Sequence, residues 1–237
     1  MSERYRSVSL RVSLVSICAA LYAIIGYLSH LGLFTPVIGV VRFWPSVFVP
    51  AVFAIAFDPW IGGVGAAIGI FISDMVIHGN PLLSLSVGVP ANFLGFYVIG
   101  KLYRVNLPGY RLTICVVIEL LVTLIVAYAS YYLGLLPLDM VIATLVAFVI
   151  TLVLSIILKG YGRKIVFAGS TGLMVGSAII GVGVWAFSQA FLLPSGERNL
   201  PLWAALTWFV WTYVTEIPFI AILVPPIIRA LEKIRLV

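Results

Sequence analysis

The sequence predicts an all-α protein, a polytopic transmembrane helix bundle with about eight spans, and three observations lead to that prediction. Hydrophobic residues make up 63% of the 237 residues and charged residues only 9%, whereas a soluble domain has about 25% charged residues. The mean hydropathy is +1.21. Eight apolar runs follow one another, most of them long enough to cross a bilayer. A soluble fold could not bury this much apolar surface, so we expect the chain to fold in a lipid bilayer.

The positions of the basic residues predict the topology. Twelve of the 14 Lys and Arg residues fall into four clusters: Arg4, Arg6 and Arg11; Lys101, Arg104 and Arg111; Lys159, Arg163 and Lys164; Arg229, Lys233 and Arg235. Basic residues concentrate in the short cytoplasmic loops of membrane proteins. Each interval between clusters should therefore cross the membrane an even number of times, which places both termini in the cytoplasm of a multi-pass cell-membrane protein.

The first half of the chain contains four predicted spans, residues 12–34, 43–57, 60–77 and 82–100. The second span is short and contains Pro45 and Pro50, so on its own it could be a re-entrant segment. In that case the next two spans would carry the basic loop 101–111 to the outside, against the usual distribution of basic residues. We therefore expect residues 43–57 to form a short, proline-distorted span.

The second half contains four more predicted spans, residues 112–133, 138–158, 166–191 and 202–228. Even the longer connections, 101–111 and 193–201, are too short to fold on their own. We therefore expect a single integral membrane domain, residues 1–237. Cys18 and Cys115 lie within apolar runs and lack metal-ligand spacing, so we expect both to be small core residues.

Two of the predicted spans are rich in glycine. Residues 60–77 contain four glycines and residues 166–191 contain five. Small residues let helices approach closely within a membrane, so close helix packing is one interpretation. The other interpretation is that the chain is a duplicated four-helix transporter half, with the glycine-rich span third in each half.

Polar side chains within the predicted spans are the candidates for function, because a charge at the bilayer centre costs at least about 2.5 to 3.5 kcal/mol. Glu216 lies near the middle of the last span, Asn92 in the middle of the fourth, and Glu119 near the inner end of the fifth. Either carboxylate could instead be protonated or hydrogen-bonded within the bundle. Asp74 and His78 are four residues apart on one helix face, which fits either an interfacial pair or a binding site.

The last span also places aromatic side chains near Glu216. Trp208 and Trp211 are three residues apart, and so are Tyr213 and Glu216, so each pair can share a helix face. An indole ring can stack on a flat ligand or contact a cation. Trp203 lies closer to the outer end, where an aromatic side chain is typical of a membrane-interface anchor.

These patterns predict a binding protein rather than an enzyme. The sequence has two histidines and lacks the HExxH, GxSxG and phosphate-loop motifs. No third ligand lies near Asp74 and His78 to complete a metal site, and no cofactor is expected. The basic residues lie at helix ends rather than along one face, which argues against nucleic acid as a partner. The predicted substrate-binding residues are Glu216, Trp211, Asn92, Trp208, Asp74 and His78.

Several motifs suggest a family. A short proline-containing segment ending in FAIAFDPW precedes the glycine-rich GGVGAAIGIFISD, which closes on Asp74, and PANFLGFYVIGK follows. Together these residues, 44–100, resemble the substrate-binding S components of energy-coupling factor (ECF) vitamin transporters. The C-terminal TEIPFIAILVPPIIRALEK, which carries Glu216, is similar to the last helix of that family. The family has six helices as a rule, so two of the predicted spans, within residues 138–191, would be additional.

The resemblance implies a function and partners. Ala19 and Ala23 in the motif AALYA match the AxxxA pattern with which the family docks its transmembrane coupling subunit, and small residues would permit that approach. The chain would capture a small, ring-containing, vitamin-like nutrient from outside, and ATPase subunits would drive its uptake. Two alternatives remain at this point. One is a proton-coupled secondary transporter or channel that uses Glu119 and Glu216 as a proton relay, and the other is a structural subunit of a larger membrane complex.

Overall fold

A computed structural model of the chain describes residues 7–33, 35–38 and 41–234. Within these ranges, seven helices are long and apolar enough to cross a membrane. They are α1 (Val8–His30), α3 (Pro59–Ile77), the continuous helix formed by α4 (Pro81–Leu83), η3 (Ser84–Gly88) and α5 (Val89–Tyr103), α6 (Gly109–Tyr132), α7 (Leu138–Ile157), α8 (Tyr161–Ala190) and α9 (Ala204–Lys233). The protein is therefore an all-α, multi-pass membrane protein, as predicted.

An eighth, shorter helical segment consists of η2 (Pro45–Val47) and α2 (Phe48–Ala56) and follows a two-stranded hairpin, β1 (Val37–Ile38) and β2 (Val41–Arg42). The predicted end of the first span at Phe34, and the basic residues Arg4, Arg6 and Arg235, lie outside the described residues.

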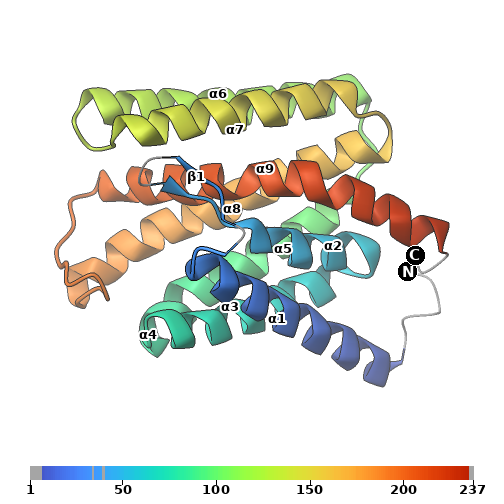
Figure 1. Cartoon of the computed structure of the whole chain (residues 1–237), viewed down its shortest axis with the longest axis horizontal. Helices are drawn as coiled ribbons and strands as arrows, with labels where there is room; N and C mark the ends of the chain where they lie inside the picture. Colours follow the sequence, from blue (N-terminus) through green and yellow to red (C-terminus); the bar gives the residue numbers. More distant parts are fainter. Residues whose placement is uncertain (1–6, 34, 39–40, 235–237) are drawn as a thin grey trace.

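The helices η2 and α2 lie on the segment that returns the chain along the bundle between α1 and α3. The contacts between these two helices advance in the same direction, from Cys18 against Gly65, through Ala19 against Gly69, to the Ala23 carbonyl, which accepts a hydrogen bond from Ser73 (3.4 Å). The helices α1 and α3 are therefore parallel, so the segment between them must travel back. The start of α1 and the end of α9 also lie at the same end of the molecule, as an even number of passes requires (Figure 1).

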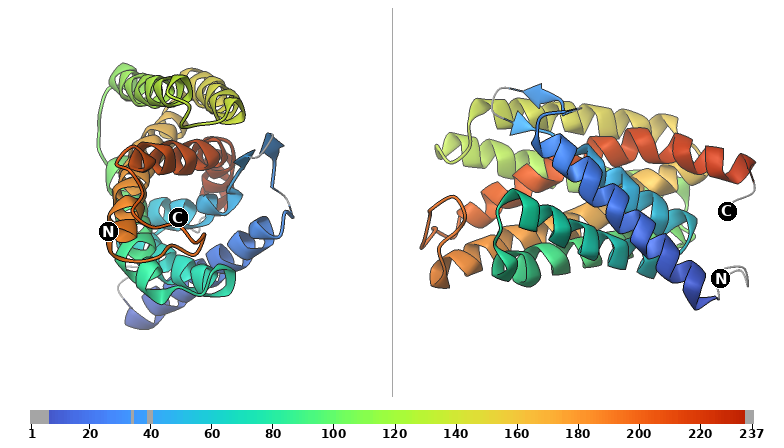
Figure 2. Two further views of the ribbon diagram at one scale, coloured as in Figure 1. Left: turned by 90° about the vertical axis from the view of Figure 1, so that its left-hand side faces the viewer. Right: turned by 60° about the horizontal axis from the view of Figure 1, so that its bottom comes forward.

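The helices form a main body with a pair of helices along one side. Seen end-on, α6 and α7 lie apart from the rest and contact it through α8 and α9 (Figure 2). The resemblance to S components predicts that the two additional helices lie within residues 138–191, which include α8. The structure instead places α8 centrally, since 61% of its most apolar stretch is buried inside the protein, compared with 28% for α6.

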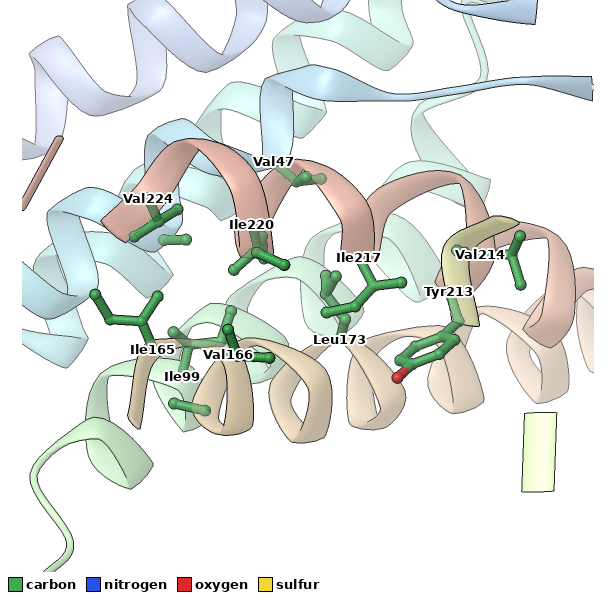
Figure 3. Packing of buried hydrophobic residues seen from close by; sticks show 14 of the residues in the cluster. Val47, Ile99, Ile165, Val166, Leu173, Tyr213, Val214, Ile217, Ile220 and Val224 are labelled. Atoms are coloured by element: carbon green, nitrogen blue, oxygen red, sulfur yellow. The ribbon is translucent and has the colours of Figure 1, made fainter. Parts of the chain in front are cut away.

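The glycines allow close approach between the helices of the main body, as the packing interpretation predicts. A Cβ atom added at Gly172 of α8 would lie 2.7 Å from the carbonyl oxygen of Gly95 in α5. Branched side chains fill the space farther along these helices. Ile220 of α9 lies over Val166 of α8, and Ile217 lies over Leu173, in the same cluster of buried residues (Figure 3).

Arg104 joins the ends of two helices, a role that the sequence did not reveal. From the end of α5, its guanidinium donates hydrogen bonds to the carbonyl oxygens of Ala54 (3.1 Å), Ile55 (3.4 Å) and Phe57 (3.3 Å). These carbonyls belong to the C-terminal end of α2, where backbone acceptors have no helical partner and a cation is favourable. One member of the second basic cluster therefore also holds the short helix in place.

Candidate functional site

A cavity of about 300 Å³ lies between α3, the η3–α5 segment, α8 and α9, with Tyr22 and Trp44 on one side. Its size is at the lower end of the range for small-molecule sites. All six predicted substrate-binding residues line it, although they come from three separate parts of the sequence: Asp74, His78, Asn92, Trp208, Trp211 and Glu216. The helix packing therefore brings these residues to one place, and their role in binding remains a prediction.

Glu216 has no partner within the described chain. It lies on α9 two residues before Pro218, which lacks the N–H that would bond to the carbonyl of Val214. Glu216 lines the cavity, and its carboxylate makes no hydrogen bond or ion pair with any residue that the structure describes. An ionised carboxylate in such surroundings requires a hydrogen-bond donor or a counter-charge.

Asp74, in contrast, is held by its neighbours. The Ser84 hydroxyl donates to Oδ2 of Asp74 at 2.6 Å, and Nε2 of His78 lies 3.4 Å from Oδ1. Nδ1 of His78 accepts a hydrogen bond from the backbone N–H of Asn80 at 3.2 Å, so the proton of a neutral imidazole lies on Nε2 and faces Asp74. The pair that the helical spacing predicts does form, and it forms at the wall of the cavity.

Asn92 positions an aromatic residue that the sequence analysis missed. The Tyr22 hydroxyl donates to Oδ1 of Asn92 at 2.8 Å, and Nδ2 of Asn92 donates to the Gly88 carbonyl at 2.9 Å. Tyr22 is 3% exposed, so the amide fixes a buried ring at the cavity wall. Seventy positions separate the two residues, and no local spacing could have related them.

Trp44 is the second lining residue that was missed. Its backbone N–H donates to the Thr215 carbonyl at 2.9 Å, next to Glu216 in the chain. This bond fastens the segment that follows the β1–β2 hairpin to α9. The aromatic side chains of Tyr22, Trp44, Trp208 and Trp211 therefore surround the same space as the free carboxylate.

A second, narrow space of about 20 Å³, which we call the extension, shares the lining residues Glu216, Asn92 and Thr212 with the cavity. Ser177 of α8 lines it and is 1% exposed, and its hydroxyl oxygen has no hydrogen-bond partner among the described residues. A space of this size holds about one water molecule or the end of a ligand. The extension thus has two polar groups, on Glu216 and Ser177, that are unpaired among the described residues.

The charge of this site is one-sided. Asp74 and Glu216 are acidic and His78 lies against Asp74, whereas no Lys or Arg is among the described residues that line the cavity or its extension. The described residues contain no group of three His, Cys, Asp or Glu side chains placed to hold a metal ion.

Glu119 lies away from the cavity, in a network of hydroxyl groups. Ser170 donates to Oε2 of Glu119 at 2.5 Å and Thr171 donates to Oε1 at 2.6 Å. The Tyr213 hydroxyl, which points from α9 toward α8 (Figure 3), lies 2.6 Å from the Ser170 hydroxyl. The sequence predicts that Glu119 is either protonated or hydrogen-bonded within the bundle, and the structure shows the hydrogen bonds.

The structure contradicts the prediction that Ala19 and Ala23 face a partner helix. They are 3% and 7% exposed, and they pack against α3 of the same chain. Gly69 lies opposite Ala19 and has no side chain, so α3 approaches closely enough to cover this face of α1.

No family model matches the chain, and no curated protein or solved structure matches it either. The fold and the site define a polytopic helical membrane protein with an acidic, aromatic cavity among its helices.

Proposed function

We propose that this chain is the substrate-capture subunit of an ECF-type importer. It binds a small, vitamin-like nutrient from outside the cell, and partner subunits, a transmembrane coupling protein and ATPases, drive the uptake. The observation that carries this proposal is the cavity of about 300 Å³ in which Glu216 has no partner. A ligand would supply the missing interactions of a carboxylate that is otherwise unfavourable within a membrane protein.

The motifs that resemble S components give further support, because three of them contribute residues to the cavity. The segment FISD ends on Asp74, PANF contains Asn92, and TEIP contains Glu216. The main body, made of α1, α2, α3, α5, α8 and α9, also has the number of helices expected for that family. On this proposal the pair α6 and α7 is the addition to a six-helix capture subunit.

Capture fits the site better than catalysis does. Ser84 is the hydroxyl beside the ionisable pair, and it donates to Asp74 rather than to His78. A nucleophilic serine needs an adjacent base that accepts its proton in the reaction, usually an imidazole. The arrangement holds Asp74 in place and provides no activated nucleophile, so we propose a transport protein without enzymatic activity.

Purification from a native or heterologous membrane tests the proposal. We expect mass spectrometry to detect one small molecule that remains bound through purification, and we expect ATPase subunits to copurify from the native membrane. Uptake into proteoliposomes should require those subunits and ATP. Uptake by this chain alone in a proton gradient would instead support a secondary transporter, and a stable complex without any ligand would support a structural subunit.

A further inference from the structure

We propose that the substrate is a planar organic cation with N–H donors, of the amidinium or aminopyridinium type, whose charged end binds Glu216. This inference rests on the proposed function, because it specifies the substrate of the same cavity. Three features of the described residues lead to it: the acidic lining of the cavity, the two unpaired polar groups of Glu216 and Ser177, and the aromatic walls.

The charge of the cavity selects against anions. Two carboxylates line it and no Lys or Arg among the described lining residues opposes them. An anionic nutrient would meet like charges in surroundings of low dielectric constant, where their repulsion is much stronger than in water. A cation would provide the counter-charge that the site lacks.

Glu216 rather than Asp74 is the partner of that charge. Both oxygens of Asp74 already face donors, Ser84 at 2.6 Å and His78 at 3.4 Å. Neither oxygen of Glu216 has a donor among the described residues. The ligand's charged group should therefore bind on the α9 side of the cavity, next to the narrow extension.

The unpaired groups require N–H donors as well as positive charge. Ser177 is 1% exposed and its hydroxyl has no partner, while Glu216 reaches the same extension. A quaternary ammonium group would neutralise Glu216 but would leave both residues without a hydrogen bond. An amidinium group can donate to two acceptors at once, in the way that a guanidinium pairs with a carboxylate.

The walls of the cavity favour a flat ring. Tyr22, Trp44, Trp208 and Trp211 line it, and the hydroxyl of Tyr22 is fixed by Asn92 at 2.8 Å. Aromatic faces attract cations and stack on planar rings. A volume of about 300 Å³ accommodates a ligand of one or two rings.

Three small probes of similar planar shape and different charge test the inference on the full chain in detergent. Benzamidinium is cationic, benzamide is neutral and benzoate is anionic. We expect benzamidinium to change the tryptophan fluorescence saturably and to raise the unfolding temperature, and we expect the other two to bind at least tenfold more weakly. Glu216→Gln keeps the size and removes the charge, so it should weaken benzamidinium binding at least tenfold. Glu119→Gln, a carboxylate change outside the cavity, is the matched control and should bind as the wild type does.

The outcomes separate this inference from the proposed function. Three results would each overturn the inference that the substrate is a planar cation. They are failure of benzamidinium to bind, equal binding of benzamide or benzoate, and wild-type binding by Glu216→Gln. A neutral or anionic nutrient identified in the purified protein would also overturn it, while leaving the capture function intact. The capture function itself would be removed by the absence of any copurified molecule together with no ATP-dependent uptake, or by uptake through this chain alone in a proton gradient.

Discussion

Glu119 connects three helices through hydroxyl groups. Its two oxygens accept hydrogen bonds from Ser170 and Thr171 of α8, and Ser170 continues the network to Tyr213 of α9. Ser170 and Tyr213 are buried, so a lost acceptor leaves a buried donor unpaired. The residue therefore fastens α6 to the main body, in contrast to Glu216, which has no such bonds.

Substitution of Glu119 distinguishes a structural role from a proton relay. Glu119→Leu should lower the free energy of unfolding by about 1 to 3 kcal/mol, because it removes the acceptor and leaves the hydroxyls unsatisfied. Glu119→Gln should remain close to wild type, since its amide can still accept one hydrogen bond and donate another to a rotated hydroxyl. The unfolding midpoint in detergent measures both effects. If Glu119→Gln unfolds normally but abolishes uptake, the residue carries protons and the structural interpretation is wrong.

At the scale of elements, α1 and α3 meet along a seam of small residues. Cys18, Ala19 and Ala23 of α1 lie opposite Gly65, Gly69 and Ser73 of α3. Without bulky side chains, the two backbones come close enough for Ala19 and Ala23 to be buried. The seam also holds Tyr22 against the cavity, so its packing and the binding site depend on each other.

Adjacent alanines provide a matched test of that seam. Ala19→Leu inserts three carbon atoms at a buried position and should destabilise the protein by about 1 to 3 kcal/mol. Ala20→Leu places the same side chain on the exposed face of α1 and should change stability by less than about 0.5 kcal/mol. Thermal unfolding of the two variants compares the cost of a leucine at the buried position with its cost at the exposed position. Equal stability would show that Ala19 does not pack as described.

Arg104 should contribute to stability beyond its charge. Arg104→Ala removes the donors to three carbonyls at the end of α2, and a loss of about 1 to 2 kcal/mol is expected for a partly exposed guanidinium. Arg111→Ala is the control, because Arg111 belongs to the same basic cluster and its guanidinium contacts the exposed Tyr110. Similar unfolding midpoints for the two variants would contradict the structural role of Arg104.

The same elements show where prediction from the sequence succeeds and where it stops. Hydropathy located all seven long helices, because a bilayer demands long apolar helices whatever their neighbours are. The predicted span 43–57 is a shorter apolar helix, Pro45–Ala56. The polarity of Glu216, Asn92 and Asp74 within apolar runs was also sufficient to find the cavity. In contrast, the spacing of Ala19 and Ala23 predicts a close helix contact without saying which helix makes it. The bonds of Tyr22 with Asn92 join positions too distant in sequence for any periodicity to relate.

The whole molecule separates two ends with different charge. The loop between α5 and α6 lies at the same end as the start of α1 and the end of α9, and the loop between α8 and α9 lies at the opposite end (Figure 2). All four basic clusters have described residues near the first end: Arg11 near the start of α1, the second cluster at the loop between α5 and α6, the third at the loop between α7 and α8, and Lys233 at the end of α9. The other end has Glu197 and Arg198, whose charges are opposite, and Asp139 in the first turn of α7. This asymmetry is the basis for an orientation across the membrane.

Cysteine labelling in intact cells tests that orientation. We expect the end with the basic loops to face the cytoplasm, because anionic lipid and the insertion process retain Lys and Arg there. Ser195→Cys, in the loop before α9, should react with a membrane-impermeant maleimide added outside. Asn106→Cys, in the loop after α5, should react only after the cells are permeabilised. Cys18 is fully buried and Cys115 is partly buried, so the labelling variants are made in a Cys115→Ala background, in which labelling of native cysteines should be low. Labelling of position 106 in intact cells would reverse the orientation and would place the candidate cavity on the opposite side from the one that capture from outside requires.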